Sequence, residues 1–201
     1  FLCYHKPVRK TQRRIYFMKS KQAKTLKKVC TFGGVLLALA AFVMIFLPQI
    51  VSANNGDTVY NGLKLAFGYT ISAGGNSIFS ASAKINFSFP NLLAYLLVTV
   101  GLLFLVLQML GIGKKNKLIA FVAAAALIAG GILFFFPLQF STITTEGGSS
   151  LIGVNFSGTH KFAEYNSENS TVWKLGYGAI VGGITAILSG LCMLGRTALS
   201  K

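Results

Sequence analysis

The sequence predicts an α-helical membrane protein, a four-transmembrane-helix bundle with a small exoplasmic antiparallel β-sheet formed by the two outer loops. Three observations predict it: four long apolar runs, basic residues confined to one side of those runs, and loops in which apolar and polar residues alternate. Of the 201 residues, 53% are hydrophobic and only 11% are charged, whereas a soluble domain averages about 25% charged residues. Lipid must therefore cover part of the surface.

The net charge of +15 is distributed unevenly along the chain. Ten Lys and Arg residues lie in residues 1–28, three follow the second apolar run and two lie near the C-terminus, while the two longer connections have no net charge. Cytoplasmic segments of membrane proteins carry such an excess, so we expect a multi-pass protein of the cell membrane with both termini cytoplasmic. The partner implied is the anionic inner leaflet, with an acidic protein as a less favoured alternative and no nucleic acid. The basic residues expected to face lipid are Lys24, Lys27, Lys28, Lys114, Lys115 and Lys117.

The first predicted elements are a basic cytoplasmic tail, 1–28, and a first transmembrane helix, 29–47, which Pro48 stops. Residues 1–17 precede Met18 and are interpreted as an upstream extension, disordered or loosely bound to lipid. An alternative interpretation is a secretory signal peptide cleaved after Ala53, because a basic segment and an apolar run precede Val-Ser-Ala. The apolar run is longer than signal peptides usually have, so the transmembrane interpretation is preferred.

The outer loop 48–91 is predicted to form a β-hairpin. Residues 59–72 and 79–89 each place mostly apolar side chains at odd positions and mostly small or polar ones at even positions, which is typical of strands with one buried face. Residues 73–76, Ala-Gly-Gly-Asn, suit the turn between them.

The rest of the chain supplies three further helices and a second loop. Transmembrane helices are predicted at 92–110, 118–136 and 172–195; the cytoplasmic turn 111–117 joins the first two, and 196–201 forms a cytoplasmic tail. The outer loop 137–171 is predicted to contain strands at 140–145 and 151–157, with a turn at Gly147-Gly148. The predicted apolar face of the sheet comprises Leu63, Leu65, Phe67, Ile85, Phe87, Ile152, Val154 and Phe156.

Small residues recur every four positions in the last predicted helix, which lets another helix approach closely. These residues are Gly178, Gly182, Ala186 and Gly190. The four helix cores hold no ionisable residue, so the sequence predicts no proton relay or ion site. A transport cavity would have to be lined by Tyr95, Thr99, Gln108 or Tyr177.

No motif in the sequence indicates an enzyme. No phosphate-binding loop, zinc-binding pair or nucleophile elbow is present, and no cofactor or metal is expected. His160 lies four residues before Glu164 and is interpreted as a solvated loop residue rather than a catalytic one. Catalysis would require a nucleophile, a base and an orienting group to converge.

The predicted four helices with both termini inside and a β-rich outer region resemble the claudin-like tetraspan layout, in architecture only. Claudins carry Trp, Gly-Leu-Trp and two Cys in the first outer loop, whereas residues 48–91 contain no Trp and no Cys. The Cys-Cys-Gly of tetraspanins is also absent. Residues 18–201 are more similar to small uncharacterised four-helix membrane proteins of Gram-positive bacteria, and neither resemblance transfers a functional residue.

Two functions remain open on this basis. The first is a non-catalytic interaction or scaffold protein of the cell envelope, whose outer loops and glycine-rich helix face bind a membrane protein or a second copy. The alternative is a small-molecule or lipid transporter, or a transporter or channel subunit, which needs a cavity at membrane depth.

Overall fold

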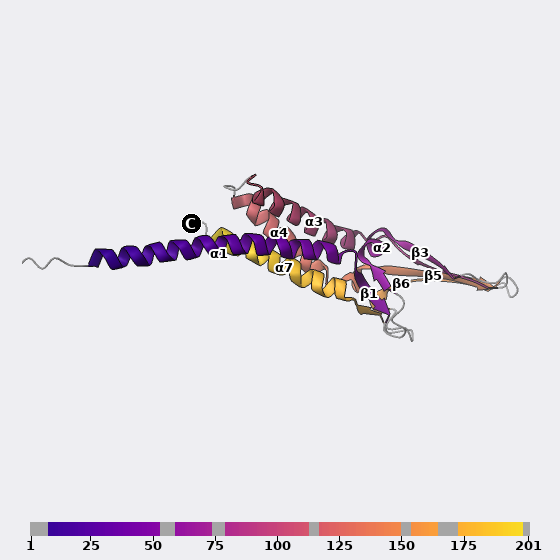
Figure 1. The fold of residues 1–201 in the computed structure, drawn as a ribbon. Helices are drawn as coiled ribbons and strands as arrows, with labels where there is room; N and C mark the ends of the chain where they lie inside the picture. The colour runs from indigo at the N-terminus through magenta and orange to yellow at the C-terminus, as the bar shows by residue number, and fades with distance from the viewer. Residues whose placement is uncertain are drawn as a thin grey trace, which may run out of the picture.

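The computed structural model describes residues 8–52, 59–73, 79–112, 117–149, 154–164 and 173–198. Long helices form one part of the molecule, and the strands lie beyond one end of them (Figure 1). The long helices in the described part of the chain are α1 (Val8–Met44), α3 (Phe89–Met109), α4 (Lys117–Leu133) and α7 (Tyr177–Ala198). Three segments, Lys24–Met44 and the whole of α3 and α7, are long and apolar enough to cross a membrane; α4 is apolar but shorter. The helical, membrane-like character predicted from the sequence is thus confirmed.

Each long helix packs against two others, so that the four helices form a closed ring. α1 contacts α3 and α7, and α4 contacts the same two helices. Their shared core contains many small side chains, among them Ala38, Ala41, Ala94, Ala124 and Ala186. Small side chains let helix backbones approach closely. The resulting van der Waals packing is a main source of attraction between helices in lipid, where association displaces no water.

α1 begins far ahead of the predicted first transmembrane helix. Residues 8–17 were expected to be disordered or loosely bound, but they form the start of one continuous helix that extends past the other helices (Figure 1). The physical reason is local: residues 8–28 contain no Gly or Pro and are rich in Lys, Arg and Gln, which favour helix.

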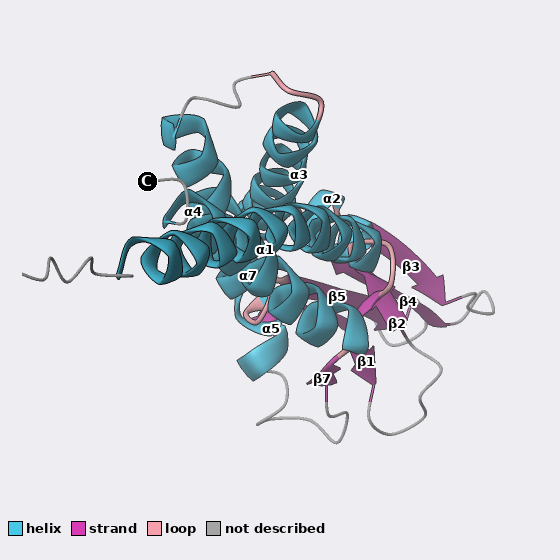
Figure 2. Cartoon of the chain, turned by 60° about the vertical axis from the view of Figure 1, so that its left-hand side comes forward, coloured by secondary structure: helices cyan, strands magenta, loops and turns pink. Residues whose placement is uncertain are grey.

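Two antiparallel sheets lie at the other end of the helices (Figure 2). The first has the order β2-β1-β7, and the second β3-β4-β5-β6. β4 and β5 come from different loops and pair in register, with Ile85 opposite Ile143. A sheet built from both loops was predicted, and the structure has it together with a second small sheet. The strands are β1 (Pro48–Ser52), β2 (Val59–Asn61), β3 (Tyr69–Ala73), β4 (Phe79–Ile85), β5 (Thr142–Ser149), β6 (Val154–Lys161) and β7 (Trp173–Leu175).

The prediction of one strand over residues 59–72 is wrong, because a short helix, α2 (Gly62–Phe67), separates β2 from β3. The Asn61 side chain caps this helix by accepting a hydrogen bond from the backbone N–H of Lys64 at 3.0 Å. Gly62, Leu65 and Ala66 are buried, which is helical spacing rather than alternation. Leu63 and Phe67 therefore face outward instead of joining the predicted apolar face.

The second loop also differs from its prediction in three places. Phe140, the predicted start of the strand 140–145, ends a short helix, α5 (Pro137–Phe140), and the strand begins at Thr142. Gly147 and Gly148 pair with β6 inside β5, so they are not the predicted turn. Trp173, which falls within the last predicted transmembrane helix (172–195), belongs to β7 and is buried, and that helix begins only at Tyr177.

A second hydrophobic core packs between the two sheets. It is formed by Ile50, Tyr60, Leu65, Ile85, Ile143, Phe162 and Trp173. Of the predicted apolar face, Leu65 and Ile85 lie in this core. Ile152 and the side chains of Val154 and Phe156 lie outside the described residues.

Candidate functional site

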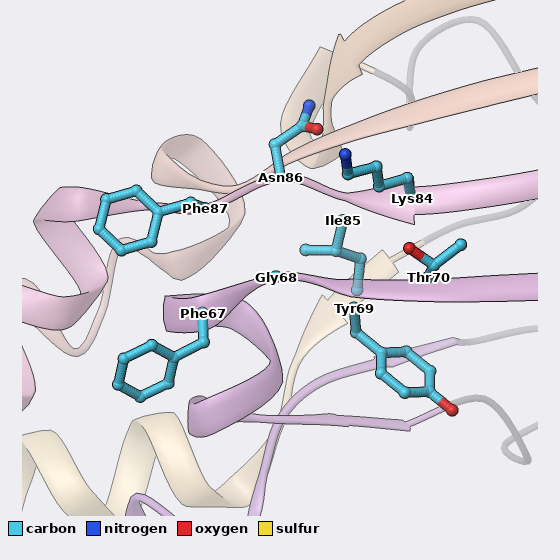
Figure 3. A pocket seen from close by; sticks show the side chains of 8 residues that line it. All are labelled: Phe67, Gly68, Tyr69, Thr70, Lys84, Ile85, Asn86 and Phe87. Atoms are coloured by element: carbon cyan, nitrogen blue, oxygen red, sulfur yellow. The ribbon is translucent and has the colours of Figure 1, made fainter.

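A hollow of about 580 Å³ lies where α2 meets β3 and β4. Two four-residue segments line it, Phe67–Thr70 and Lys84–Phe87 (Figure 3). The first segment leaves α2 and enters β3, and the second leaves β4 and approaches α3. The hollow therefore lies at the base of the larger sheet, beside the start of a long apolar helix.

Two features fix the backbone at the hollow: the positive φ of Gly68 and a backbone hydrogen bond between Ser88 and Ala66. Gly68 has a φ of 84°, and a Cβ there would lie 2.8 Å from the carbonyl oxygen of Ile85, so only glycine fits without strain. The backbone N–H of Ser88 donates to the carbonyl of Ala66 at 3.1 Å. These contacts place Phe67 and Phe87 at the same end of the hollow.

The two ends of the hollow differ in polarity. The rings of Phe67 and Phe87, which are 64% and 57% exposed, lie at the end nearest the helices (Figure 3). Thr70 and Lys84 are paired in register farther along the strands. On the opposite face of β3, where Tyr69 alternates with Thr70, the ammonium of Lys64 lies 4.4 Å from the ring centroid of Tyr69, a cation–π distance. The hollow is thus amphiphilic along the direction of the strands.

Asn86 joins the hollow to the centre of the sheet. Its side-chain amide donates to the hydroxyl oxygens of Thr142 at 3.1 Å and Thr144 at 2.9 Å. The hydroxyl of Thr144 is also hydrogen-bonded to that of Thr159, at 2.8 Å. This network fixes the position where β4 ends and the chain turns toward α3.

Replacing Asn86 with alanine is expected to loosen this junction. Two hydrogen bonds are lost, each worth about 0.5–1.5 kcal/mol, so the free energy of unfolding of the sheet should fall by about 1–3 kcal/mol. Hydrogen exchange of β4 and β5 amides measures the effect. Lys84→Ala, at an exposed neighbouring position, is the control and should leave protection unchanged; equal loss in both variants would contradict the prediction.

Two ionisable groups of the sheet region, Glu164 and Tyr60, have shifted pKa values. The carboxylate of Glu164 accepts from the backbone N–H of Lys161 at 3.3 Å and lies 3.3 Å from its ammonium. These hydrogen bonds, and then the charges of Lys161 and His160, hold the pKa of Glu164 below its ordinary value. Burial, followed by the neighbouring Tyr69 phenol, raises the pKa of Tyr60. In the part of the chain that the structure describes, no three His, Cys, Asp or Glu residues gather to hold a metal ion.

The glycine-rich face of α7 lies between α1 and α4. Gly178, Gly182, Ala186 and Gly190 are all buried. A Cβ on Gly182 would lie 2.6 Å from a ring carbon of Phe134, and one on Gly190 would lie 2.9 Å from the carbonyl oxygen of Ala124. This face is therefore filled by helices of the same chain.

The four residues considered for a transport cavity do not come together in the structure. Tyr95 is buried and stacks edge-to-face on Phe134, with ring centroids 5.3 Å apart. Thr99 donates to the carbonyl of Tyr95 at 2.7 Å. Gln108 lies thirteen residues along α3 from Tyr95, which is about 20 Å, and Tyr177 is exposed.

The described basic residues that were predicted to face lipid lie at the end of the helices away from the sheets. Lys24 and Lys28 are exposed on α1, Lys27 is partly exposed beside them, and Lys117 is exposed at the start of α4. Lys114 and Lys115 lie outside the described residues. Arg196 donates to the side-chain oxygen of Gln108 at 3.2 Å, which ties α7 to α3 at this end.

The hollow itself was missed by sequence reasoning, which placed Phe67 and Phe87 on a buried strand face. Asn61-Gly62 and Gly68 were the available signals, because they indicate a capped helix and a positive φ within the apparent strand.

In comparisons with known proteins, no family model and no curated protein matches this chain.

Proposed function

We propose that this chain is a non-catalytic interaction protein of the cell envelope, which crosses the membrane four times and presents its larger sheet to a protein partner on the outer side. One observation carries the proposal. Several polar side chains within the helices bond to other parts of the chain, whereas the sheet extends away from the helices and its edge strands β3 and β6 are each paired on one side only among the described residues (Figure 1).

Several polar side chains of the helices form hydrogen bonds within the chain. The hydroxyl of Ser189 in α7 donates to the carbonyl of Gly34 in α1 at 2.7 Å. At the start of α3, the amide of Asn91 donates to the hydroxyl of Ser141 at 2.7 Å. Such bonds hold helices together in lipid and leave little for a passing substrate to bind.

The pairing of β4 with β5 supports four crossings. α3 and α4 follow one another between these two strands, so if α3 crosses the membrane, α4 must cross back for the strands to meet. α4 spans 17 residues, or about 26 Å, and the apolar turn after it extends this length toward the roughly 30 Å of a bilayer core.

The larger sheet supports partner binding. β3 and β6 are its edge strands, and unpaired edge strands can accept a strand from another chain. Thr70, Lys84, Thr144 and Thr159 lie opposite one another in register across the four strands. Residues opposite one another share a face, so this row forms a polar surface suited to hydrogen bonding with a partner.

The membrane arrangement is tested by cysteine labelling. In a variant whose natural cysteines are replaced by alanine, Lys117→Cys and Thr159→Cys are made separately. An impermeant maleimide on intact cells is expected to label Thr159→Cys only, and Lys117→Cys only after lysis. Labelling of both positions from the same side would contradict four crossings.

Partner binding is tested by placing a photo-crosslinking amino acid at Thr70 or Thr159 in cells of the organism that makes the protein. Each is expected to give a discrete adduct with one protein. Leu103, exposed on α3, is the matched control and should give none. A discrete adduct at Leu103 alone would move the interface to the helices, and the absence of any adduct at the sheet would count against the proposal.

A further inference from the structure

We infer that the hollow at the base of the larger sheet binds a phospholipid of the outer leaflet, with an acyl chain against Phe67 and Phe87 and the phosphate beside Lys84 and Thr70. The inference rests on the membrane arrangement proposed above, and it adds a ligand that the partner-binding surface does not require. Three observations carry it: the order of polarity in the hollow, its continuity with α3, and the charge around it.

The order of polarity matches that of a lipid lying along the membrane normal. The exposed phenylalanine rings are at the end of the hollow nearest the helices, and the hydroxyl and ammonium groups are farther out along the strands (Figure 3). A phospholipid has the same order, with acyl chains toward the bilayer centre and the phosphate toward water. A soluble anion would need only the polar end and would leave the two rings uncovered.

The apolar end of the hollow continues into the outer surface of α3. Phe87 is followed by Phe89, the first residue of that helix, and exposed apolar side chains then recur at three- and four-residue spacing. They are Phe89, Leu93, Leu96, Val100 and Leu103. This stripe lies on one side of the helix and belongs to a segment long and apolar enough to cross a membrane. A chain seated on Phe67 and Phe87 can therefore lie along this stripe without leaving an apolar surface.

The charge of the hollow selects an anionic headgroup. Lys84 is the basic side chain among the residues that line it. Thr70, opposite Lys84 in β3, adds a hydroxyl donor. A phosphate diester accepts hydrogen bonds and carries a negative charge, so these groups complement it. Phosphatidylglycerol has that single net charge, whereas phosphatidylcholine balances it with its own cation.

The inference is tested by native mass spectrometry of the full chain in detergent, titrated with phosphatidylglycerol or phosphatidylcholine. The wild-type protein is expected to bind a first phosphatidylglycerol more tightly than phosphatidylcholine. Lys84→Gln should weaken phosphatidylglycerol binding about fivefold, the factor that one lysine near a lipid surface contributes. Lys174→Gln removes an exposed lysine from the other sheet and should change nothing. Equal weakening by both substitutions would mean diffuse charge attraction and would overturn the site.

The apolar end is tested with Phe87→Ser, which should weaken binding of both lipids. Phe121→Ser, at an exposed position on α4, is the matched control and should leave the first binding event unchanged. Soluble glycerol phosphate is expected not to displace the lipid; displacement at similar concentrations would show that the acyl chain contributes nothing. Both phenylalanines are exposed, and thermal unfolding of each variant confirms that it remains folded.

A photoactivatable phosphatidylglycerol with a diazirine on its acyl chain locates the bound lipid. Adducts are expected in peptides containing Phe67 or Phe87, and adducts confined to the other end of the helices would overturn the inference. The outcome is separable from that of the proposed function. If cysteine labelling supports four crossings and these lipid experiments fail, only the lipid site is wrong; if the labelling fails, the membrane arrangement is wrong as well.

Discussion

Replacing Gly182 with leucine is expected to separate the helices that pack on α7. A Cβ at this position would lie 2.6 Å and 2.8 Å from two ring carbons of Phe134 and 3.0 Å from the Cβ of Met44. The rest of a leucine side chain has no room between α1 and α4. Overpacking of this kind costs about 1–3 kcal/mol and sometimes more, and we expect the upper part of that range because two helices must move.

The measurement is thermal unfolding in mild detergent, followed by circular dichroism and by size-exclusion chromatography of the heated protein. Gly33→Leu is the matched control, because nothing lies within 4 Å of a Cβ on Gly33, and leucine favours helix over glycine by about 1 kcal/mol. Gly33→Leu should therefore be neutral or stabilising. A midpoint that falls equally in both variants would show that glycine at position 182 is not required by packing.

The same glycine face shows what the sequence could predict and where prediction stopped. Small residues at four-residue spacing indicate that something packs on α7, and they do so whether the neighbour is a helix of the same chain or of another. The pattern does not identify which residues pack on the glycines, because Phe134 and Met44 are distant from α7 in sequence. Their approach to Gly182 depends on how the connecting loops fold. The structure places helices of this chain there.

Alternation along the first outer loop was a weaker guide than apolar length along the helices. An apolar run near twenty residues has few structural alternatives, whereas a segment of only six residues within an alternating stretch is long enough to form a short helix instead. In residues 62–67 the cap at Asn61 and the close approach of Gly62 to the carbonyl of Ile45 select the helix. The second predicted strand, 79–89, forms over residues 79–85 only, because the chain then turns into α3.

The sequence could not predict the candidate site either, because its residues come together only through contacts between distant segments of the chain. Lys84 and Asn86 belong to a predicted strand, but their meeting with Phe67 and Thr70 depends on the turn that Gly68 makes. The polar contacts of Asn86 depend on residues in the second loop, more than fifty positions later. Only the pairing of β4 with β5 brings these groups together.

Replacing Phe162 with alanine is expected to release the two sheets from one another while the helices stay folded. Phe162 is fully buried, and its ring centroid lies 5.8 Å from that of Tyr60 and 5.2 Å from that of Trp173. Both neighbours belong to the smaller sheet, whereas Phe162 directly follows the last strand of the larger one. Truncating a buried phenylalanine costs about 3–5 kcal/mol, and this core is small.

Trp173 makes the outcome measurable, because it is the single tryptophan of the chain. Its emission should shift to the red in Phe162→Ala as water reaches the cluster, and protease cleavage in the strands should increase. Helical circular dichroism should change little, since the cores of the helices and of the sheets share no buried residue. Phe67→Ala removes an exposed ring and should leave the emission of Trp173 unchanged. If Phe162→Ala instead lowers helical and tryptophan signals together in a single transition, the two cores fold as one unit, and the sheet cannot rearrange for a partner without disturbing the helices.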